Sequence, residues 1–219
     1  MQEDLIELTA LVLSSAPIGE YDRRVVLLTR ERGRIACFAR GARRPGNPLM
    51  APSLAFCFGS YRVRAGRNSN VLVEAKLNAY FEKIRSDIAL TCYASYFSEV
   101  LQYVTRENSD ASALLLLAFQ SFRALESERI PNRLVRAVFE IRLVISEGEF
   151  LPPGQEDGFS AAALRAVQHI QSSPLRTLYT FAVSDGVLAE LEHIARVSMD
   201  RSLRHGFESL EILKALQQM

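Results

Sequence analysis

The chain has 219 residues, of which 48% are hydrophobic and 23% are charged, a balance that excludes a disordered chain and predicts an ordinary globular one. No apolar run approaches the roughly 18 residues that suggest a membrane span, so we expect no membrane contact. The net charge of +1 conceals two parts of opposite sign: residues 1–85 contain 14 Lys and Arg against 8 Asp and Glu, and residues 86–219 contain 12 against 17. This polarity is expected if only the basic part meets a polyphosphate.

Residues 1–80 carry the alternating pattern of short β-strands separated by turn-forming residues. The first predicted strand ends at Pro17 and Gly19, and the next two form a hairpin around residues 31–33. A second pair of strands turns at residues 65–70. The predicted strands are residues 7–14, 23–29, 34–40, 58–64 and 71–77. Five short strands at this spacing predict a small closed barrel.

The segment between the two hairpins, residues 41–52, reads GARRPGNPLMAP. Its three prolines and two glycines disfavour helix and strand, so we predict a flexible basic loop. Three further arginines lie at the tip of the first hairpin, where they could contact phosphate or serve only as solubilising charge: Arg30, Arg32 and Arg34.

From residue 86 onward the hydrophobic period changes from two to three and four, the spacing of core-facing helices. Ser86 or Asp87 is predicted to cap the first helix, Pro131 to open the third, and Gly206 to interrupt the last. The predicted helices are residues 86–105, 110–126, 131–146, 160–171, 174–183 and 184–216. The fold class is therefore α+β, with the barrel and an all-α part in separate domains. These domains are residues 1–80 and residues 81–219.

The chemical motifs of common enzyme classes are absent from the sequence. There is no phosphate-binding loop, no dinucleotide fingerprint and no nucleophile elbow. The three histidines lie far apart in sequence without a second ligand at metal spacing. The cysteines lack a CxxC pair, and we interpret them as buried thiols of a reducing compartment: Cys37, Cys57 and Cys92. We therefore expect no catalytic residue, no metal and no cofactor.

Basic side chains of the predicted barrel form the candidate nucleic-acid surface. Arg62 and Arg64 alternate onto one face of a strand, so a phosphate backbone could follow them and release counterions. Tyr61 and Phe58 could stack on bases, although aromatic residues at such positions more often belong to a barrel core. The complete predicted set is Arg23, Arg24, Arg40, Arg43, Arg44, Arg62, Arg64, Arg67 and Lys76.

Short segments spread over most of the chain match the motifs of one known family. Residues 19–22 (GEYD) look like a GExD stretch, and residues 40–43 (RGAR) look like a KGAR signature with Arg in place of Lys. Four more segments match in the same order: residues 29–35 (TRERGRI), 93–99 (YASYFSE), 139–143 (FEIRL) and 148–152 (GEFLP). Residues 54–56 (LAF) stand where LQPF-like residues are usual. Together these segments resemble the bacterial RecO family of DNA repair and recombination mediators.

The resemblance implies an N-terminal OB barrel followed by a helical domain. RecO-like proteins bind single- and double-stranded DNA and anneal complementary strands. They work with RecR to load RecA onto DNA coated by the single-stranded DNA-binding protein SSB, and none is expected to use a catalytic residue. The family's helical domain also accepts the acidic, hydrophobic C-terminal tail of SSB. A basic side chain beside an apolar groove meets that need, and we assign it to Arg133, Arg136 and Phe139.

The chain departs from the family pattern in two places. Many members carry a four-cysteine zinc module after the GxxP segment, whereas no cysteine follows Cys92 in this chain, so we predict no zinc module. Residues 207–209 (FES) stand where LKS is usual, which puts Glu208 in place of a basic residue and puts a C-terminal DNA contact in doubt. Both departures concentrate the predicted DNA binding in the barrel.

Two other readings remain open from the sequence. The chain could be a protein-interaction adaptor that reaches DNA only through a partner such as RecR or SSB. It could also be an enzyme of unrecognised type, although no nucleophile, metal or acid/base pair stands out. Residues 1–7 lack the basic and apolar regions of a signal peptide, so a bacterial cytoplasmic location at the nucleoid is expected.

Overall fold

The structure, a computed structural model, describes residues 5–66 and 69–217 of the chain. The chain divides into two compact units that are each discontinuous in sequence. The first comprises Met1–Glu82 and Phe97–Leu115, and the second comprises Lys83–Tyr96 and Leu116–Met219. The two predicted domains, residues 1–80 and 81–219, stay a prediction.

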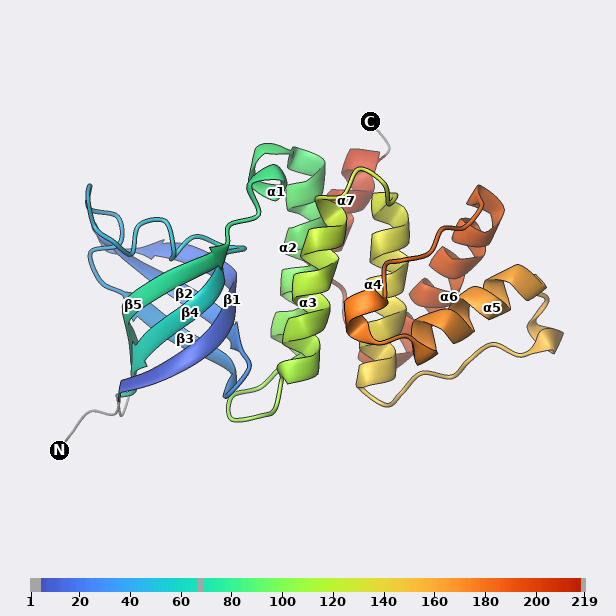
Figure 1. The fold of residues 1–219 in the computed structure, drawn as a ribbon, viewed down its shortest axis with the longest axis horizontal. Helices are drawn as coiled ribbons and strands as arrows, with labels where there is room; N and C mark the ends of the chain where they lie inside the picture. Colours follow the sequence, from blue (N-terminus) through green and yellow to red (C-terminus); the bar gives the residue numbers. More distant parts are fainter. Residues whose placement is uncertain (1–4, 67–68, 218–219) are drawn as a thin grey trace. The chain divides into compact units, whose positions relative to one another are not determined.

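The first unit is built on a closed five-stranded barrel (Figure 1). Its strands are β1 (Leu5–Ile18), β2 (Asp22–Thr29), β3 (Gly33–Ala39), β4 (Phe58–Arg64) and β5 (Asn70–Ala79). They close in the order β1-β2-β3-β5-β4, with β1 pairing to both β2 and β4. The β3–β5 pair is parallel and every other pair is antiparallel. All five predicted strands are present, and the α+β fold with an OB-type barrel is confirmed.

The barrel interior follows from the two-residue period of its strands. Along β3, the buried residues Ile35, Cys37 and Ala39 alternate with half-buried ones, and all three belong to the barrel core. Tyr61 is also part of this core: it is 0% exposed, and its hydroxyl donates a hydrogen bond of 3.1 Å to the Pro52 carbonyl. The suggestion that Tyr61 stacks on bases is therefore wrong, because its ring already fills the barrel.

The segment between β3 and β4 has neither helix nor strand, as predicted, but it is closely held rather than loose. Successive turns bond back along it, for example from the Arg44 amide to the Gly41 carbonyl at 2.9 Å. Leu49 is buried in the barrel core. The Phe56 amide donates to the Val12 carbonyl of β1 at 2.7 Å. The prediction of a flexible loop is corrected accordingly, since local turn bonds and a buried anchor fix this segment.

Within the first unit, residues 97–115 fasten the tip of the β2–β3 hairpin. The Arg34 amide donates to the Arg106 carbonyl at 3.0 Å, and the Arg34 guanidinium donates to the Gln102 carbonyl. Gly33 adopts a left-handed φ of 62°, and a Cβ there would overlap the Arg106 carbonyl oxygen. Arg34 therefore serves the fold, and its guanidinium is already engaged by protein.

The remaining elements are helices (Figure 1). They are α1 (Glu82–Ser86), α2 (Ile88–Val104), α3 (Ser112–Leu125), α4 (Asn132–Ser146), α5 (Ala161–Ser172), α6 (Asp185–Leu203) and α7 (Glu208–Gln217). Of the two candidate caps for α2, Asp87 accepts the Leu90 amide at 3.0 Å. In the second unit, α4 packs mainly against α6 and buries most of its length, which makes it the central helix there.

The C-terminal half of the chain contains one prediction that is wrong and one that is confirmed. Instead of a helix at residues 174–183 there is a single 3-10 turn, Leu175–Thr177. The hydroxyls of Thr177 and Thr180 donate to backbone carbonyls three residues earlier, and such local bonds compete with a continuing helix. The predicted interruption near Gly206 is present, since α6 ends at Leu203 and the capping residue after it, Arg204, adopts a left-handed conformation.

Candidate nucleic-acid interface

The β1–β2 loop and the segment after β3 are fastened to each other at one end of the barrel. The Arg43 amide donates to the Tyr21 carbonyl at 2.8 Å, and the Arg43 guanidinium donates to the Gly19 carbonyl at 3.3 Å. The Gly41 amide donates to the Asp22 carboxylate at 2.7 Å. Gly41 has a φ of 65°, a left-handed conformation that favours glycine. The two loops therefore form one fixed surface.

This surface carries a group of exposed cations that we call the arginine cluster: Arg24, Arg40, Arg43 and Arg44. Arg24 lies on β2 opposite Phe38 of β3, which is half-buried. Arg23 is half-buried and lies between Pro17 and Ala39 in the register. Because the Asp22 carboxylate already accepts the Gly41 amide, part of the nearby negative charge is engaged within the fold.

One member of the arginine cluster lies against an aromatic residue that was not predicted to belong to the site. The Arg44 guanidinium carbon lies 4.6 Å from the centroid of the Tyr21 ring, a cation–π contact. Tyr21 remains 39% exposed in this arrangement. A hydrogen bond with the Glu20 carboxylate, with some desolvation, raises the pKa of the Tyr21 hydroxyl. The only sequence signal for Tyr21 was its place within the GEYD segment.

The predicted cations on β4 and β5 lie in a different electrostatic setting. Arg62 forms an ion pair of 2.5 Å with Glu74 across the two strands. Arg62, Glu74 and Lys76 line an outer cavity of 570 Å³. Glu7 also lines this cavity and accepts the Ser60 hydroxyl at 3.2 Å. Positive and negative side chains alternate on this face, so its net attraction for phosphate is weaker than that of the arginine cluster.

Two predicted residues complete the barrel set. Arg64 is exposed at the end of β4. Arg67 lies outside the described residues. The structure thus separates the predicted cations into the arginine cluster at the β1–β2 loop and a charge-balanced group on β4 and β5.

The location of the arginine cluster matches the usual binding surface of its fold. OB folds bind oligonucleotides with the face of strands 2 and 3 and with the loops that join strands 1–2 and 4–5. Here the hairpin tip at one end of that face is bonded to residues 97–115, through Arg34 and Gly33 among others. The opposite end, beside the β1–β2 loop, is where the arginine cluster is exposed.

The predicted partner-binding residues lie on α4 in the second unit. Phe139 is 0% exposed and belongs to the helical core, so a partner cannot touch it in this conformation. Arg133 binds both carboxylate oxygens of Glu192 on α6, and the Arg136 guanidinium lies 3.5 Å from the same carboxylate. Arg136 also faces Glu140 at 3.6 Å. The binding role of these residues stays a prediction, and Phe139 can serve it only by supporting the helix.

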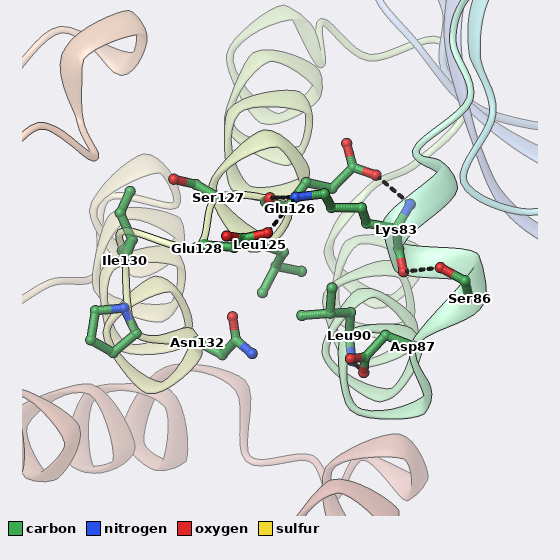
Figure 2. Close-up of a pocket in the computed structure, with 11 residues that line it drawn as sticks. Lys83, Ser86, Asp87, Leu90, Leu125, Glu126, Ser127, Glu128, Ile130 and Asn132 are labelled. Atoms are coloured by element: carbon green, nitrogen blue, oxygen red, sulfur yellow. Dashed lines mark hydrogen bonds and ion pairs between the residues drawn. The ribbon is translucent and has the colours of Figure 1, made fainter.

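A cavity of 430 Å³ in the second unit, which we call the helical unit, lies between α1, the start of α2 and the α3–α4 loop (Figure 2). Lys83 reaches across it and donates to the Glu128 carboxylate at 2.9 Å and to the Glu126 carbonyl at 3.4 Å. The Lys83 amide donates to the Glu126 side chain at 3.0 Å. Lys83 is the one lysine that lines this cavity, and its ammonium group is already bonded to Glu126 and Glu128. The cavity is therefore a poor phosphate site.

The described residues contain neither a cluster of metal ligands nor a helix that could span a membrane. Over residues 5–66 and 69–217, no three His, Cys, Asp or Glu side chains gather as metal ligands would. Cys37 and Cys57 are buried, and Cys92 is half-buried. No helix in the same ranges is both long and apolar enough to span a bilayer.

Comparison with known proteins covers most of the chain. The family Recombination protein O N terminal matches residues 1–81, and the family Recombination protein O C terminal matches residues 85–152. The chain is similar to the DNA repair protein RecO of Acetivibrio thermocellus, with 27% identity over an alignment 247 positions long that spans 98% of both chains.

Two further relatives are similar over a shorter stretch. The DNA repair protein RecO of Bacillus pumilus is 31% identical over 140 residues, which are 64% of this chain and 54% of the relative. That of Symbiobacterium thermophilum is 32% identical over 141 residues, which are 64% of this chain and 55% of the relative. These two matches span about half of the relatives' length.

The barrel, the order of the matched segments and the similarity to these proteins agree with one another. The matched N-terminal family covers all five strands of the OB-type barrel, and the C-terminal family begins within α1 and extends just beyond α4. The chain therefore belongs to the RecO family of DNA repair and recombination proteins.

Proposed function

We propose that this chain is a non-enzymatic mediator that binds single- and double-stranded DNA and anneals complementary strands. The observation that carries the proposal is the arginine cluster, exposed at the start of β2 and on the segment after β3, beside the β1–β2 loop of an OB-type barrel. Four arginines there offer planar, permanently charged donors suited to phosphate oxygens. Neutralising the phosphates of two complementary strands would lower the repulsion that opposes their pairing.

The chain's partners are part of the same proposal. By analogy with its family, it works with RecR to load RecA onto SSB-coated DNA, in the bacterial cytoplasm at the nucleoid. The acidic, hydrophobic SSB tail would meet the helical unit, where Arg136 lines a cavity of 540 Å³ and Arg133 is paired with Glu192 of the same lining. Apolar side chains of that cavity include Met199 and Leu210. Charge attraction and apolar contact together suit such a tail.

A salt titration of oligonucleotide binding tests the DNA-binding step. Because each neutralised phosphate releases counterions, the logarithm of affinity should fall linearly with the logarithm of salt, by about 0.7 per phosphate on single strands. Four contacts would give a slope of about −3. The double variant Arg43→Ala, Arg44→Ala should weaken binding to all sequences alike and flatten that slope. The matched control is Arg165→Ala, an exposed arginine of α5 that should leave both unchanged.

The same experiment separates this proposal from a protein adaptor. A wild-type chain that shows no affinity for DNA, yet is captured by RecR or by an SSB tail peptide, would replace the DNA-binding proposal with the adaptor. Annealing of complementary oligonucleotides coated with SSB then measures the mediator activity directly. We expect annealing by the intact chain without any nucleotide cofactor.

A further inference from the structure

Tyr21 differs from the other aromatic side chains considered for base contact. Tyr61 is enclosed in the barrel core and Phe58 is half-buried on β4. Tyr21, in contrast, is 39% exposed within the arginine cluster and has the Arg44 guanidinium against its ring. An exposed aromatic ring in a cationic surface is the arrangement that single-strand-binding proteins use to stack on bases.

The backbone that carries the Tyr21 ring is held in place before any ligand arrives. The backbone carbonyl of Tyr21 accepts the Arg43 amide at 2.8 Å, and the adjacent Asp22 carboxylate accepts the Gly41 amide at 2.7 Å. Arg44, which contacts the ring, is anchored by its own amide to the Gly41 carbonyl at 2.9 Å. A tyrosine has only two side-chain torsions, so little conformational freedom remains to be lost when a base stacks on it.

We propose that Tyr21, supported by Arg44, stacks on an unpaired DNA base and thereby makes the arginine cluster prefer single strands to duplex. This inference rests on the proposed DNA binding. Phosphates are available to the arginines in both forms of DNA, whereas the faces of duplex bases are covered by neighbouring base pairs. The ring therefore adds affinity for single strands and adds little for duplex.

Three oligonucleotides of equal length separate the phosphate contacts from the stacking. They are an oligothymidine, an abasic strand with the same sugar-phosphate backbone, and a duplex, all measured by fluorescence anisotropy at one salt concentration. Wild-type chain should bind oligothymidine roughly tenfold more tightly than the abasic strand. Tyr21→Ala should lose that difference and keep its affinity for the abasic strand and the duplex. Tyr21→Phe, which keeps the ring, should behave as wild type.

A matched control addresses effects on folding. Tyr103→Ala removes another exposed tyrosine of the first unit and should leave the ratio of oligothymidine to abasic affinity unchanged. If Tyr21→Ala weakens binding to all three oligonucleotides equally, or to none, the stacking inference is overturned while the phosphate contacts stand. If wild-type chain binds none of them, the proposed DNA binding fails, and the inference fails with it.

A direct optical signal is also accessible, because the chain contains no tryptophan. Tyr21→Trp therefore introduces a single tryptophan at the proposed stacking position. Stacking on a base should quench its fluorescence when oligothymidine is added. The abasic strand should bind without quenching. Equal quenching by both strands, or quenching by neither, would contradict a stacked base at this position.

Discussion

The Tyr96 hydroxyl donates a hydrogen bond of 2.8 Å to the Glu140 carboxylate, and the Arg136 guanidinium lies 3.6 Å from the same oxygen. This carboxyl is fully enclosed by the helical unit. The pKa of Glu140 is raised to about 7, chiefly by burial and to a smaller extent by the nearby Glu192 and Asp200 carboxylates, against the lowering effect of Arg136 and of the Tyr96 hydrogen bond. Glu140 is therefore a buried acid that changes charge close to neutral pH.

Glu140→Gln should make the helical unit less sensitive to pH. Since the folded pKa of about 7 lies above the ordinary value of 4.5, the folded chain binds the proton more tightly than the unfolded chain. The free energy of unfolding of wild-type chain should therefore fall as pH rises from about 4.5 to 7, by an amount on the order of 2–3 kcal/mol, and stay lower above that range.

Urea unfolding at several pH values between 5 and 8 measures this effect. The stability of Glu140→Gln relative to wild type should rise with pH across this window. Glu211→Gln, which changes an exposed glutamate of α7, serves as the control and should follow the wild-type curve. Parallel curves for wild type and Glu140→Gln would show that Glu140 does not titrate in this range.

Glu192→Gln should strengthen binding of an acidic, hydrophobic SSB tail peptide. Glu192 accepts both Arg133 and Arg136, so it competes with any incoming carboxylate for these two guanidinium groups. Removing its charge frees Arg133 and leaves Arg136 facing Glu140 alone. Because charge-assisted bonds of this kind are worth about 1.5–3 kcal/mol, we expect affinity to rise about tenfold or more. Isothermal titration calorimetry with the peptide gives the measurement. Arg136→Ala should act in the opposite direction, and unchanged affinity in both variants would exclude this surface.

Arg62→Ala should weaken DNA binding less than Arg43→Ala does. The charge of Arg62 is already engaged by Glu74, so Arg62 has less to offer a phosphate, whereas the Arg43 guanidinium donates to the neutral Gly19 carbonyl. Each true phosphate contact should change the salt slope by about 0.7 on single strands. Anisotropy titrations at four salt concentrations compare the two slopes. A larger slope change for Arg62→Ala would move the interface to β4 and β5.

Gly33→Ala should destabilise the first unit by more than Gly46→Ala. Both glycines have a left-handed φ, 62° and 77°, so both substitutions carry similar backbone strain. Only at Gly33 would the new Cβ overlap a neighbour, the Arg106 carbonyl oxygen; around Gly46 nothing lies within 4 Å. Strain alone should cost about 1 kcal/mol, and the overlap should add 1–3 kcal/mol at Gly33. Thermal unfolding of the two variants makes the comparison, and equal losses would mean that residues 97–115 do not hold the hairpin tip.

Local pattern was sufficient to predict the five strands and most of the helices. The alternation of Ile35, Cys37 and Ala39 is decided by the period of a strand, and the helical stripe of α4 by the period of a helix. These are relations between residues two to four positions apart, which a sequence displays directly. The predicted helix at residues 174–183 failed because threonine side chains took the backbone carbonyls, a local competition that periodicity does not reveal.

The sequence by itself also determined that the front of the chain is basic and that its segments follow the RecO order. Only the tertiary structure decided which cations remain available. It paired Arg62 with Glu74 across two strands, and Arg133 with Glu192 across 59 positions of sequence. It also placed Arg44 against Tyr21 and left the ring exposed. Such pairings depend on strand register and helix packing, which bring together side chains that no short-range pattern relates.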